Sequence, residues 1–451
     1  MKIVIIGAGK VGSTLAEQLA NEAHQLQILD IDSDAVEFLD TNLDVLTSVG
    51  DGLDIHVLRD AGVKSADLVI ATMPTDEQNL TACLLAKKLG AENTVARVRE
   101  PQHLATANIL RSDLGLSMIL NPESSSASEI ARILRTPSAI KIDTFCKGKV
   151  ELYKVRLSGD SPLNGLSLQA LGRQHKGVLI CTVERNGDQV YIPDGHFVLQ
   201  AGDYINFVAD PTAAYRFLKK INIPVHPVRQ VMLIGGSLIA YYLAKELWKF
   251  KTNVKIIESN KAVCDKLSVM LPYASIIHGD GTDENLLREE CIDEMDAVVT
   301  LTGYDEANIL ISLHARTVSQ AKIVTKINRT GFSRVISSME LGSVFHPRDI
   351  AANLTVRFAR ALHNSMGSNV ETLYKLMGGR VEALEFRATE KFHGCGIKLM
   401  DLKTRPNLLI GAINRAGAII TPGGQDSILP GDTVVVVTTT MGLKDLDDIL
   451  E

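Results

Sequence analysis

Short apolar runs alternate with amphipathic stretches along the first 120 residues of the chain. The apolar runs predict strands at Lys2–Ile6, Gln25–Asp30, Val45–Val49, Ala66–Ala71, Thr94–Val98 and Ser117–Leu120. The stretches between them predict helices, among them Gly12–Asn21, Asp54–Ala61 and Glu77–Leu89, the last opened by a capping box of Thr75 and Gln78. Strand–helix alternation with β-branched strands indicates a parallel, doubly wound sheet.

The pattern changes after this sheet. Residues 121–138 predict a capped helix, which we interpret as a crossover or interface element. From about 140 to 221, short strands and turn residues with one terminal helix, Pro211–Ile221, predict a small α+β lobe. Residues 221–227 contain two prolines and are predicted to be a linker.

The second half of the chain carries the same landmarks as the first, offset by 228 or 229 positions. Gly7 matches Gly235, Gly50-Asp51-Gly52 matches Gly279-Asp280-Gly281, and Gly202-Asp203 matches Gly431-Asp432. The second unit is predicted to end in a strand, Thr433–Thr438, and a helix, Leu443–Leu450. So constant an offset indicates duplication of a whole multi-element unit, not a solenoid of short repeats.

The predicted fold class is therefore α/β, with two Rossmann-like doubly wound parallel-sheet domains, each followed by a small α+β C-terminal lobe. The predicted domains are residues 1–121, 139–222, 228–346 and 367–451. Four domains suit a chain of 451 residues.

Composition narrows the functional classes. A net charge of −6 and a pI near 6.0 give no electrostatic footprint for nucleic acid. The longest apolar stretch, Val231–Ala244, is interrupted by glycines and is too short to span a bilayer, and the start of the chain has no signal-peptide pattern. Six scattered cysteines without a Cys-x-x-Cys pair predict reduced thiols in the cytoplasm, and His393-Gly394-Cys395 lacks the second pair that a metal site needs.

The glycine motif Gly7-Ala8-Gly9-Lys10-Val11-Gly12 follows a predicted strand and opens a predicted helix. In this context the three glycines allow a tight turn, close approach of a phosphate and helix–strand packing, while the helix N-terminus attracts a pyrophosphate. Asp30 ends the next strand, where it would accept hydrogen bonds from ribose hydroxyls and repel a 2′-phosphate. The motif predicts an NAD-type or adenine nucleotide, not NADP.

Further polar residues follow the predicted strands of the first domain. Lys10 is either a partner for the extra phosphate charge of ATP or a solvated lysine. Asp51 either binds adenosine or caps the next helix. Thr72 and Met73 end the fourth strand, where open sheets bind ligands, and Arg97 and Arg99 are predicted to end the fifth strand on one face. For Asp76, Glu77 and Asn79 we favour helix capping over ligand binding.

The second domain departs from this motif. It keeps Gly235, but Ser237 and Ala240 replace the second and third glycines. A Cβ at position 237 crowds a bound pyrophosphate without excluding it. The remaining counterparts of the first site are Glu258, Asp280, Thr302 and Lys326. We interpret the second site as weaker, altered in preference or empty.

On these residues, the chain resembles the TrkA family of bacterial regulatory subunits of Trk potassium uptake. The glycine loop with Asp30, the paired Asp-Glu-x-Asn stretches, Ala96-Arg97-Val98-Arg99 and the repeated small lobe carry the resemblance over essentially the whole chain. It implies two tandem RCK units (regulators of potassium conductance) and a tetramer that forms a ring of eight units beneath a membrane potassium translocator. It implies responses to NAD(H) and to ATP or ADP. Related small lobes sometimes bind cyclic di-AMP, but no such site is identifiable here.

By the same resemblance, the nucleotide contacts fall in both halves of the chain. The first set is Gly7, Ala8, Gly9, Lys10, Val11, Asp30, Met73 and Arg97, and the second set is Gly235, Ser237, Glu258 and Thr302.

Two other classes of protein share the Rossmann evidence. An NAD-dependent oxidoreductase needs a general acid or base and a shaped substrate pocket, yet the eleven histidines form no motif and the small lobe is duplicated, not specialised. A soluble nucleotide sensor without a membrane partner is the third alternative. We expect a regulatory protein and not an enzyme, with no catalytic residues.

Overall fold

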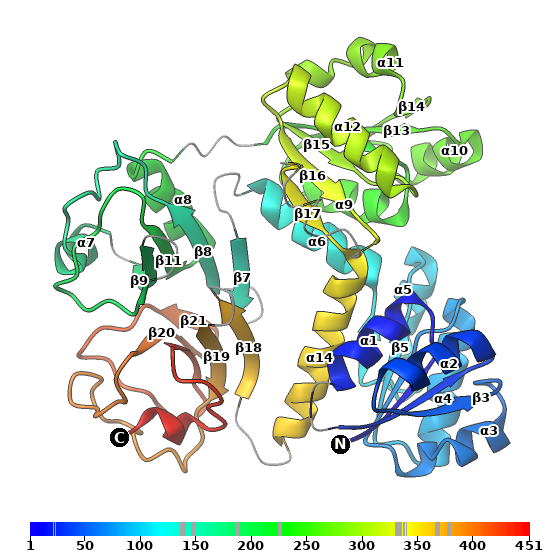
Figure 1. The fold of residues 1–451 in the computed structure, drawn as a ribbon, viewed down its shortest axis with the longest axis horizontal. Helices are drawn as coiled ribbons and strands as arrows, with labels where there is room; N and C mark the ends of the chain where they lie inside the picture. Colours follow the sequence, from blue (N-terminus) through cyan, green and yellow to red (C-terminus); the bar gives the residue numbers. More distant parts are fainter. Residues whose placement is uncertain are drawn as a thin grey trace. The chain divides into compact units, whose positions relative to one another are not determined.

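The computed structural model describes residues 1–20, 22, 24–135, 141–145, 150–175, 177–185, 189–223, 228–329, 336, 339, 341–365, 370–376 and 380–451. The chain divides into two compact units, which are coloured along the sequence in Figure 1. One unit combines Met1–Arg135 with Pro227–Val356, and the other combines Thr136–His226 with Arg357–Glu451. Each unit therefore takes one piece from each half of the duplicated sequence.

The first unit contains two parallel sheets with the same element order. The first sheet and its helices are β1 (Lys2–Ile6), α1 (Lys10–Ala20), β2 (Gln25–Asp30), α2 (Ser33–Asn42), β3 (Leu46–Val49), α3 (Ile55–Asp60), η1 (Val63–Ser65), β4 (Leu68–Ala71), α4 (Asp76–Leu89), β5 (Asn93–Arg97), α5 (Pro101–Ile109), β6 (Met118–Leu120) and α6 (Pro122–Arg135). The second sheet and its helices are β12 (Gln230–Ile234), α9 (Leu238–Trp248), β13 (Asn253–Glu258), α10 (Lys261–Met270), β14 (Ser275–His278), α11 (Glu284–Glu289), η3 (Ile292–Glu294), β15 (Ala297–Thr300), α12 (Asp305–Val318), β16 (Lys322–Lys326), β17 (Ser343–Phe345) and α14 (Pro347–Ser365).

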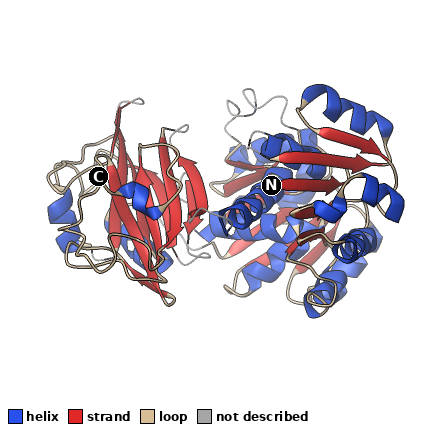
Figure 2. Cartoon of the chain, turned by 90° about the horizontal axis from the view of Figure 1, so that it is seen from below, coloured by secondary structure: helices blue, strands red, loops and turns tan. Residues whose placement is uncertain are grey.

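Both sheets are doubly wound, as the sequence predicts. The strand orders are β3-β2-β1-β4-β5-β6 and β14-β13-β12-β15-β16-β17. The order reverses beside the first strand of each sheet, which is where open α/β sheets bind ligands at their carboxyl ends. The central strands β1 and β4 are buried on both faces because helices cover both sides of the sheet. Figure 2 shows these helices lying on either side of the strands.

The predicted helix at 121–138 appears as α6, and its last predicted residues lie outside the described part of the chain. Its apolar residues Ala127, Ile130 and Leu134 belong to the core of the second sheet, together with Leu243 and Leu247 of α9. The crossover helix of the first domain therefore packs on the second domain.

The second unit contains two five-stranded antiparallel sheets, and strands dominate it in Figure 2. The first lobe comprises β7 (Lys141–Phe145), β8 (Val150–Arg156), α7 (Leu168–Gln174), β9 (Val178–Arg185), β10 (Gln189–Tyr191), β11 (Tyr204–Ala209) and α8 (Pro211–Lys220). The second comprises β18 (Val370–Leu376), β19 (Val381–Arg387), β20 (Leu408–Arg415), β21 (Ala418–Ile420), β22 (Thr433–Thr438) and η5 (Leu446–Ile449). The strand orders β7-β8-β11-β9-β10 and β18-β19-β22-β20-β21 correspond one to one.

Two helix predictions for the small lobes are wrong. The first lobe has an additional helix, α7, which Ser167 caps by accepting a hydrogen bond from the Ala170 amide. The predicted helix Leu443–Leu450 is only the 3₁₀ turn η5. Gly442 has a φ of 79°, and Asp445 caps the turn, so the chain can begin a helix only close to its last residue.

The two small lobes share an apolar cluster that includes Leu152, Cys181, Val381 and Val435. Each lobe also has a separate core of its own. The linker prediction for residues 221–227 falls largely on residues 224–227, which lie outside the described residues. Among the residues that are described, no helix has both the length and the apolar character of a membrane span.

Candidate functional site

The first glycine loop joins β1 to α1 at the carboxyl end of the first sheet. Gly7 has a φ of 107°, and a Cβ there would lie 2.8 Å from the Thr72 backbone. A Cβ on Gly12 would lie 1.8 Å from the carbonyl oxygen of Gly7. A Cβ on Gly9 would meet no protein atom within 4 Å. The packing of the first loop therefore leaves no room for a side chain at Gly7 or Gly12, whereas the space beside Gly9 is open.

Asp30 holds this loop from the end of β2. Its Oδ2 atom accepts a short hydrogen bond from the Ala8 amide, and its Oδ1 atom accepts one from the Asp32 amide at 2.9 Å. Asp32 in turn caps α2. The predicted ribose acceptor thus also positions the Ala8 amide of the glycine loop.

The end of β4 is tied to the loop and to β5. The hydroxyl of Thr72 donates to the carbonyl of Gly7 at 2.9 Å, and Met73 is buried. The fully buried Asn79 accepts from the Met73 amide at 2.7 Å and donates to the carbonyls of Met73 and Arg97. Asp76 accepts from the backbone amide of Arg99 at 3.0 Å. Asp76 and Asn79 thus join α4 to the backbone that follows β4 and β5, and we call side chains with this role straps. This role is more specific than the helix capping predicted from the sequence.

Arg97 and Arg99 contact different parts of the protein. β5 ends at Arg97, so the prediction that both arginines end this strand is wrong for Arg99. Arg97 donates to the carbonyl of Met73 at 3.3 Å, and burial lowers its pKa. Arg99 Nε lies 2.7 Å from Oε1 of Glu123 at the start of α6. Among the described residues, Arg97 Nε and Glu123 Oε2 are buried without a hydrogen-bond partner.

The alternatives for Asp51 and Lys10 are resolved only in part. Asp54, not Asp51, caps α3 by accepting from the His56 amide, whereas Asp51 accepts from the Leu53 amide at 2.9 Å. Lys10 is exposed at the first position of α1. Because Lys10 is exposed, both predicted roles stay open for it.

The second loop reproduces the turn with different contacts. Gly235 has a φ of 108° and packs against the Leu301 backbone as Gly7 packs against Thr72. Glu258 Oε2 accepts from the Gly236 amide at 2.6 Å, as Asp30 does from Ala8. A Cβ on Gly236 would lie 3.0 Å from Cγ of Glu258, so glycine here makes room for the longer acid.

Ser237 occupies the position of Gly9. It precedes α9 without making a side-chain cap, and its Oγ is buried with no hydrogen-bond partner among the described residues. Ala240 takes the place of Gly12 and is fully buried. A side chain therefore stands where the first loop is open.

The other residues of the second site repeat the straps of the first. Asn308 accepts from the Thr302 amide at 3.0 Å and donates to the Lys326 carbonyl at 3.0 Å. Asp280 accepts from the amide and hydroxyl of Thr282, and these hydrogen bonds lower its pKa. Asp280 is thus engaged locally, as Asp51 is.

The ends of the two sheets influence each other electrostatically. Burial is the main cause that lowers the pKa of Lys326 at the end of β16. Asp305 and Glu123 act in the opposite direction, while Lys10 of the first loop lowers this pKa further. Residues of both repeats therefore contribute charge to the region between the loops. The sequence pattern missed the contribution of Glu123, which follows Asn121-Pro122 at a helix start.

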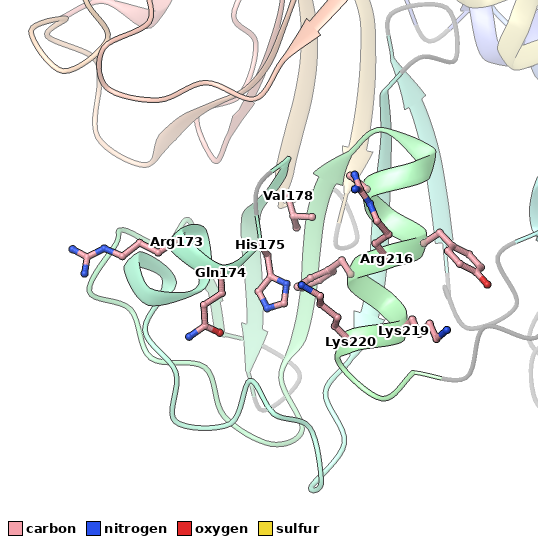
Figure 3. A pocket seen from close by; sticks show the side chains of 10 residues that line it. Arg173, Gln174, His175, Val178, Arg216, Lys219 and Lys220 are labelled. Carbon is pink, nitrogen blue, oxygen red and sulfur yellow. The ribbon is translucent and has the colours of Figure 1, made fainter.

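A separate hollow of about 590 Å³ lies in the first small lobe, between the end of α7 and α8. Its lining is cationic, but Figure 3 shows that Arg173 and Lys219 point to opposite sides, and only His175 and Lys220 lie close together. Burial, with a smaller contribution from Lys220, lowers the pKa of His175. These cations do not converge on one point, so we assign no ligand to this hollow. Elsewhere among the described residues, no group of three or more metal-ligating side chains is found.

Comparisons with known proteins agree with this architecture. The TrkA-N domain family matches residues 3–122 and 231–347, and the TrkA-C domain family matches residues 152–222 and 384–451. The chain is 34% identical over 450 residues to the Trk system potassium uptake protein TrkA homolog of Archaeoglobus fulgidus, covering 100% of both chains. It is 32% identical over 455 residues to TrkA homolog 1 of Methanosarcina mazei, covering 99% of both chains.

Solved structures show the same fold. The RCK domain of GsuK superposes with a TM-score of 0.62 at 20% identity, covering 97% of this chain and 92% of that chain. A GsuK channel bound to NAD gives the same TM-score and identity over 97% of this chain and 77% of that chain. With both family matches repeated in tandem and relatives above 30% identity over the full length, the chain belongs to the TrkA family of Trk system potassium uptake proteins.

Proposed function

We propose that this chain is a regulatory subunit that binds NAD(H), ATP or ADP at its first glycine loop and controls potassium transport through a Trk-type membrane translocator. The observation that carries the proposal is the open space at Gly9, between two glycines whose surroundings leave no room for a side chain. The first-turn amides of α1 supply donors for a phosphate, and the carboxylate of Asp30, which also holds the Ala8 amide, supplies an acceptor for the ribose.

The similar proteins support the choice of ligand and partner. The full-length relatives are named as potassium uptake proteins of the Trk system, and GsuK structures are described with bound NAD and with bound ADP. We propose the same ligand class here, with both nucleotide types competing for one site. We also propose the four domains at 1–121, 139–222, 228–346 and 367–451, a tetrameric ring of eight units, and a location at the inner face of the membrane through the partner.

In the mechanism that follows, bound nucleotide favours one of two arrangements of the domains in the ring. Bound nucleotide contacts the loop, Asp30 and the ends of β4 and β5. Through Arg99 it affects α6, which packs on the second domain. A ligand that binds two arrangements of the domains with different affinity shifts their populations. A coupling of about 1–3 kcal/mol per site, repeated around a ring, is sufficient for control of a channel.

Calorimetry on the Asp30→Asn variant tests the site. The amide keeps one acceptor oxygen but removes the charge, so affinity for NADH, ATP and ADP should fall together, by about 1.5–3 kcal/mol, the size of a hydrogen bond to a charged group. Glu258→Gln, the same change in the second loop, is the matched control and should leave the first-site affinity unaltered. Unchanged affinity in folded Asp30→Asn would refute the assignment.

Two further measurements separate the rival functions. Turnover of NADH against a panel of metabolites would identify an oxidoreductase. Copurification with the potassium translocator, and nucleotide-dependent potassium flux in vesicles that contain both proteins, are expected for the proposed role. Nucleotide binding without NADH turnover, and without copurification or potassium flux, would identify a sensor that acts without a membrane partner.

A further inference from the structure

The turn between α9 and β13 exposes aromatic and basic side chains in direct succession. Residues 248–251, Trp-Lys-Phe-Lys, are all exposed. Trp248 is 51% exposed and Phe250 is 50% exposed. The Trp248 indole is stacked on Tyr273, with ring centroids 4.5 Å apart and planes inclined by 18°. One face of the indole is therefore fixed against the protein.

The first repeat shows that the fold does not need these side chains. α1 ends at Ala20 and β2 begins at Gln25, as α9 ends at Trp248 and β13 begins at Asn253. The corresponding turn reads Ala-Asn-Glu-Ala-His. The same strand–helix–strand topology is thus built without aromatic residues at these positions.

The charge around the second turn is mostly positive. Lys245, Lys249 and Lys251 are exposed, as is Arg229, whose carbonyl accepts from the Asn253 amide at 2.7 Å. Two acids lie near these cations. The Glu246 carboxylate lies 2.8 Å from Lys249 Nζ, and Asp296 accepts from the backbone amide of Arg229 at 2.8 Å. Lys251 has a φ of 57°, so the chain reverses sharply at the tip of the turn.

We propose that this aromatic–basic turn, residues 248–251, contacts the surface of an anionic phospholipid bilayer. Tryptophan and phenylalanine favour both protein interfaces and the headgroup region of membranes, but lysine is depleted at protein interfaces and is attracted to anionic lipid. The combination of two exposed aromatic rings with flanking lysines therefore favours lipid over a protein partner.

The position of the turn leaves the glycine loops free. α9 begins at Leu238 beside the second loop and runs eleven residues to Trp248, about 16 Å at the rise of an α-helix. The turn thus lies at the opposite end of the sheet from the second glycine loop. The contact does not depend on nucleotide binding, so it can be tested whether or not the function proposed above is correct.

Trp248 is the only tryptophan of the chain and serves as its own reporter. The full-length protein is mixed with vesicles of phosphatidylcholine alone or with 30% phosphatidylserine (roughly the anionic content that attracts basic segments). We expect cosedimentation and a blue shift of the tryptophan emission with the anionic vesicles, and a loss of both in high salt. The Lys249→Gln/Lys251→Gln double variant keeps the reporter and should bind roughly 25-fold more weakly, about fivefold for each lysine.

The Lys219→Gln/Lys220→Gln double variant on α8 removes the same charge elsewhere and is the matched control, which should bind like the unmodified protein. Phe250→Ala should weaken binding while circular dichroism remains unchanged. Equal binding to neutral vesicles, equal losses in the two lysine double variants, or sedimentation without a blue shift would overturn the proposal. So would a change in oligomeric state on Trp248→Ala, measured by light scattering, since that would make the turn a contact between copies of the chain.

Discussion

The hydroxyl of Tyr242, on α9 of the second parallel domain, donates to the carbonyl of Arg99 in the first domain at 2.8 Å. The same oxygen lies 3.1 Å from Nδ2 of Asn121, which precedes α6. Burial raises the pKa of Tyr242 to about 12, so the phenol stays protonated and remains a donor. Because Arg99 also pairs with Glu123, this hydroxyl links the segment that follows β5 in the first domain to the second domain.

Removal of the Tyr242 hydroxyl should weaken the contact between the two parallel domains. Tyr242→Phe keeps the ring in the core but loses the donor, so the free energy of unfolding should fall by about 1 kcal/mol, the net value of a hydrogen bond. Urea denaturation monitored by circular dichroism measures the change. Tyr241→Phe is the control, since the Tyr241 hydroxyl makes neither of these contacts. An equal loss of unfolding free energy in Tyr242→Phe and Tyr241→Phe would show that the hydrogen bonds of the Tyr242 hydroxyl make no specific contribution to stability.

Substitutions in the first glycine loop separate its contribution to stability from its contribution to nucleotide binding. Gly9→Ala should leave the free energy of unfolding within about 0.5 kcal/mol, because its Cβ meets no protein atom, yet it should abolish most nucleotide binding. Gly12→Ala should instead destabilise the protein by about 1–3 kcal/mol or more, because its Cβ would collide with the Gly7 carbonyl. Thermal denaturation and calorimetry on both variants check this. A Gly9→Ala variant that binds normally would contradict the assigned path of the phosphate.

Lys322 should make stability depend on pH in the alkaline range. Its amine donates to the Ile133 carbonyl of α6 at 2.7 Å, and burial lowers its pKa from 10.5 to about 8. Between pH 8 and about 10.5 the unfolded chain therefore binds more protons at this lysine than the folded chain does, so this group makes the folded state more stable as pH rises through that window. Below pH 8 both states are protonated, and the cost of burying the charge is constant.

The comparison with Lys322→Met isolates this contribution, since methionine has a similar length and no charge. Melting temperatures of both proteins are measured from pH 7 to 10.5. The unmodified protein should gain stability relative to the variant across the upper part of this range. A difference that does not change with pH would show that Lys322 has an ordinary pKa.

The Rossmann domains were predictable from sequence because their signals are local. The strands Lys2–Ile6 and Gln25–Asp30 and the capping box of Thr75 and Gln78 occur as predicted, since apolar periodicity and helix caps depend on neighbouring residues. The duplicated landmarks also predicted that the second sheet would have the order of the first. The prediction of a helix at Leu443–Leu450, as the end of the repeated unit, was wrong because Gly442 has a φ of 79° and only a 3₁₀ turn follows it.

The contacts between the repeats were not predictable in the same way. Tyr242 and Asn121 are separated by 121 positions, and neither belongs to a motif. The straps formed by Asn79 and Asn308 did have a signal, because the Asp-x-x-Asn spacing occurs in both halves. The sequence pattern does not show that these side chains bond to strand ends, since that depends on how neighbouring strands pair.

Lys10 should discriminate between nucleotides by phosphate charge. It is exposed at the first position of α1, and we expect it to pair with the extra phosphate charge of ATP and not with the nicotinamide end of NADH. Lys10→Met should therefore reduce the ratio of ATP to ADP affinity and leave NADH binding nearly unchanged. Calorimetry with the three ligands measures this. Equal losses for all three would mean that Lys10 only supports the turn, and no loss would leave it a solvated side chain.

Ser237 should be the residue that limits the second site. The first loop is open at Gly9, whereas the second carries at the same position a Cβ and a buried hydroxyl oxygen that has no partner within the described part of the chain. Ser237→Gly removes both while Gly235 and Glu258 keep the turn and its amide in place. The variant should therefore create or strengthen nucleotide binding in the second half. Calorimetry in the Gly9→Ala background, where the first site is disabled, measures the second site alone. If Ser237→Gly adds no binding there, the obstacle lies elsewhere, and Ala240 at the position of Gly12 becomes the next residue to exchange.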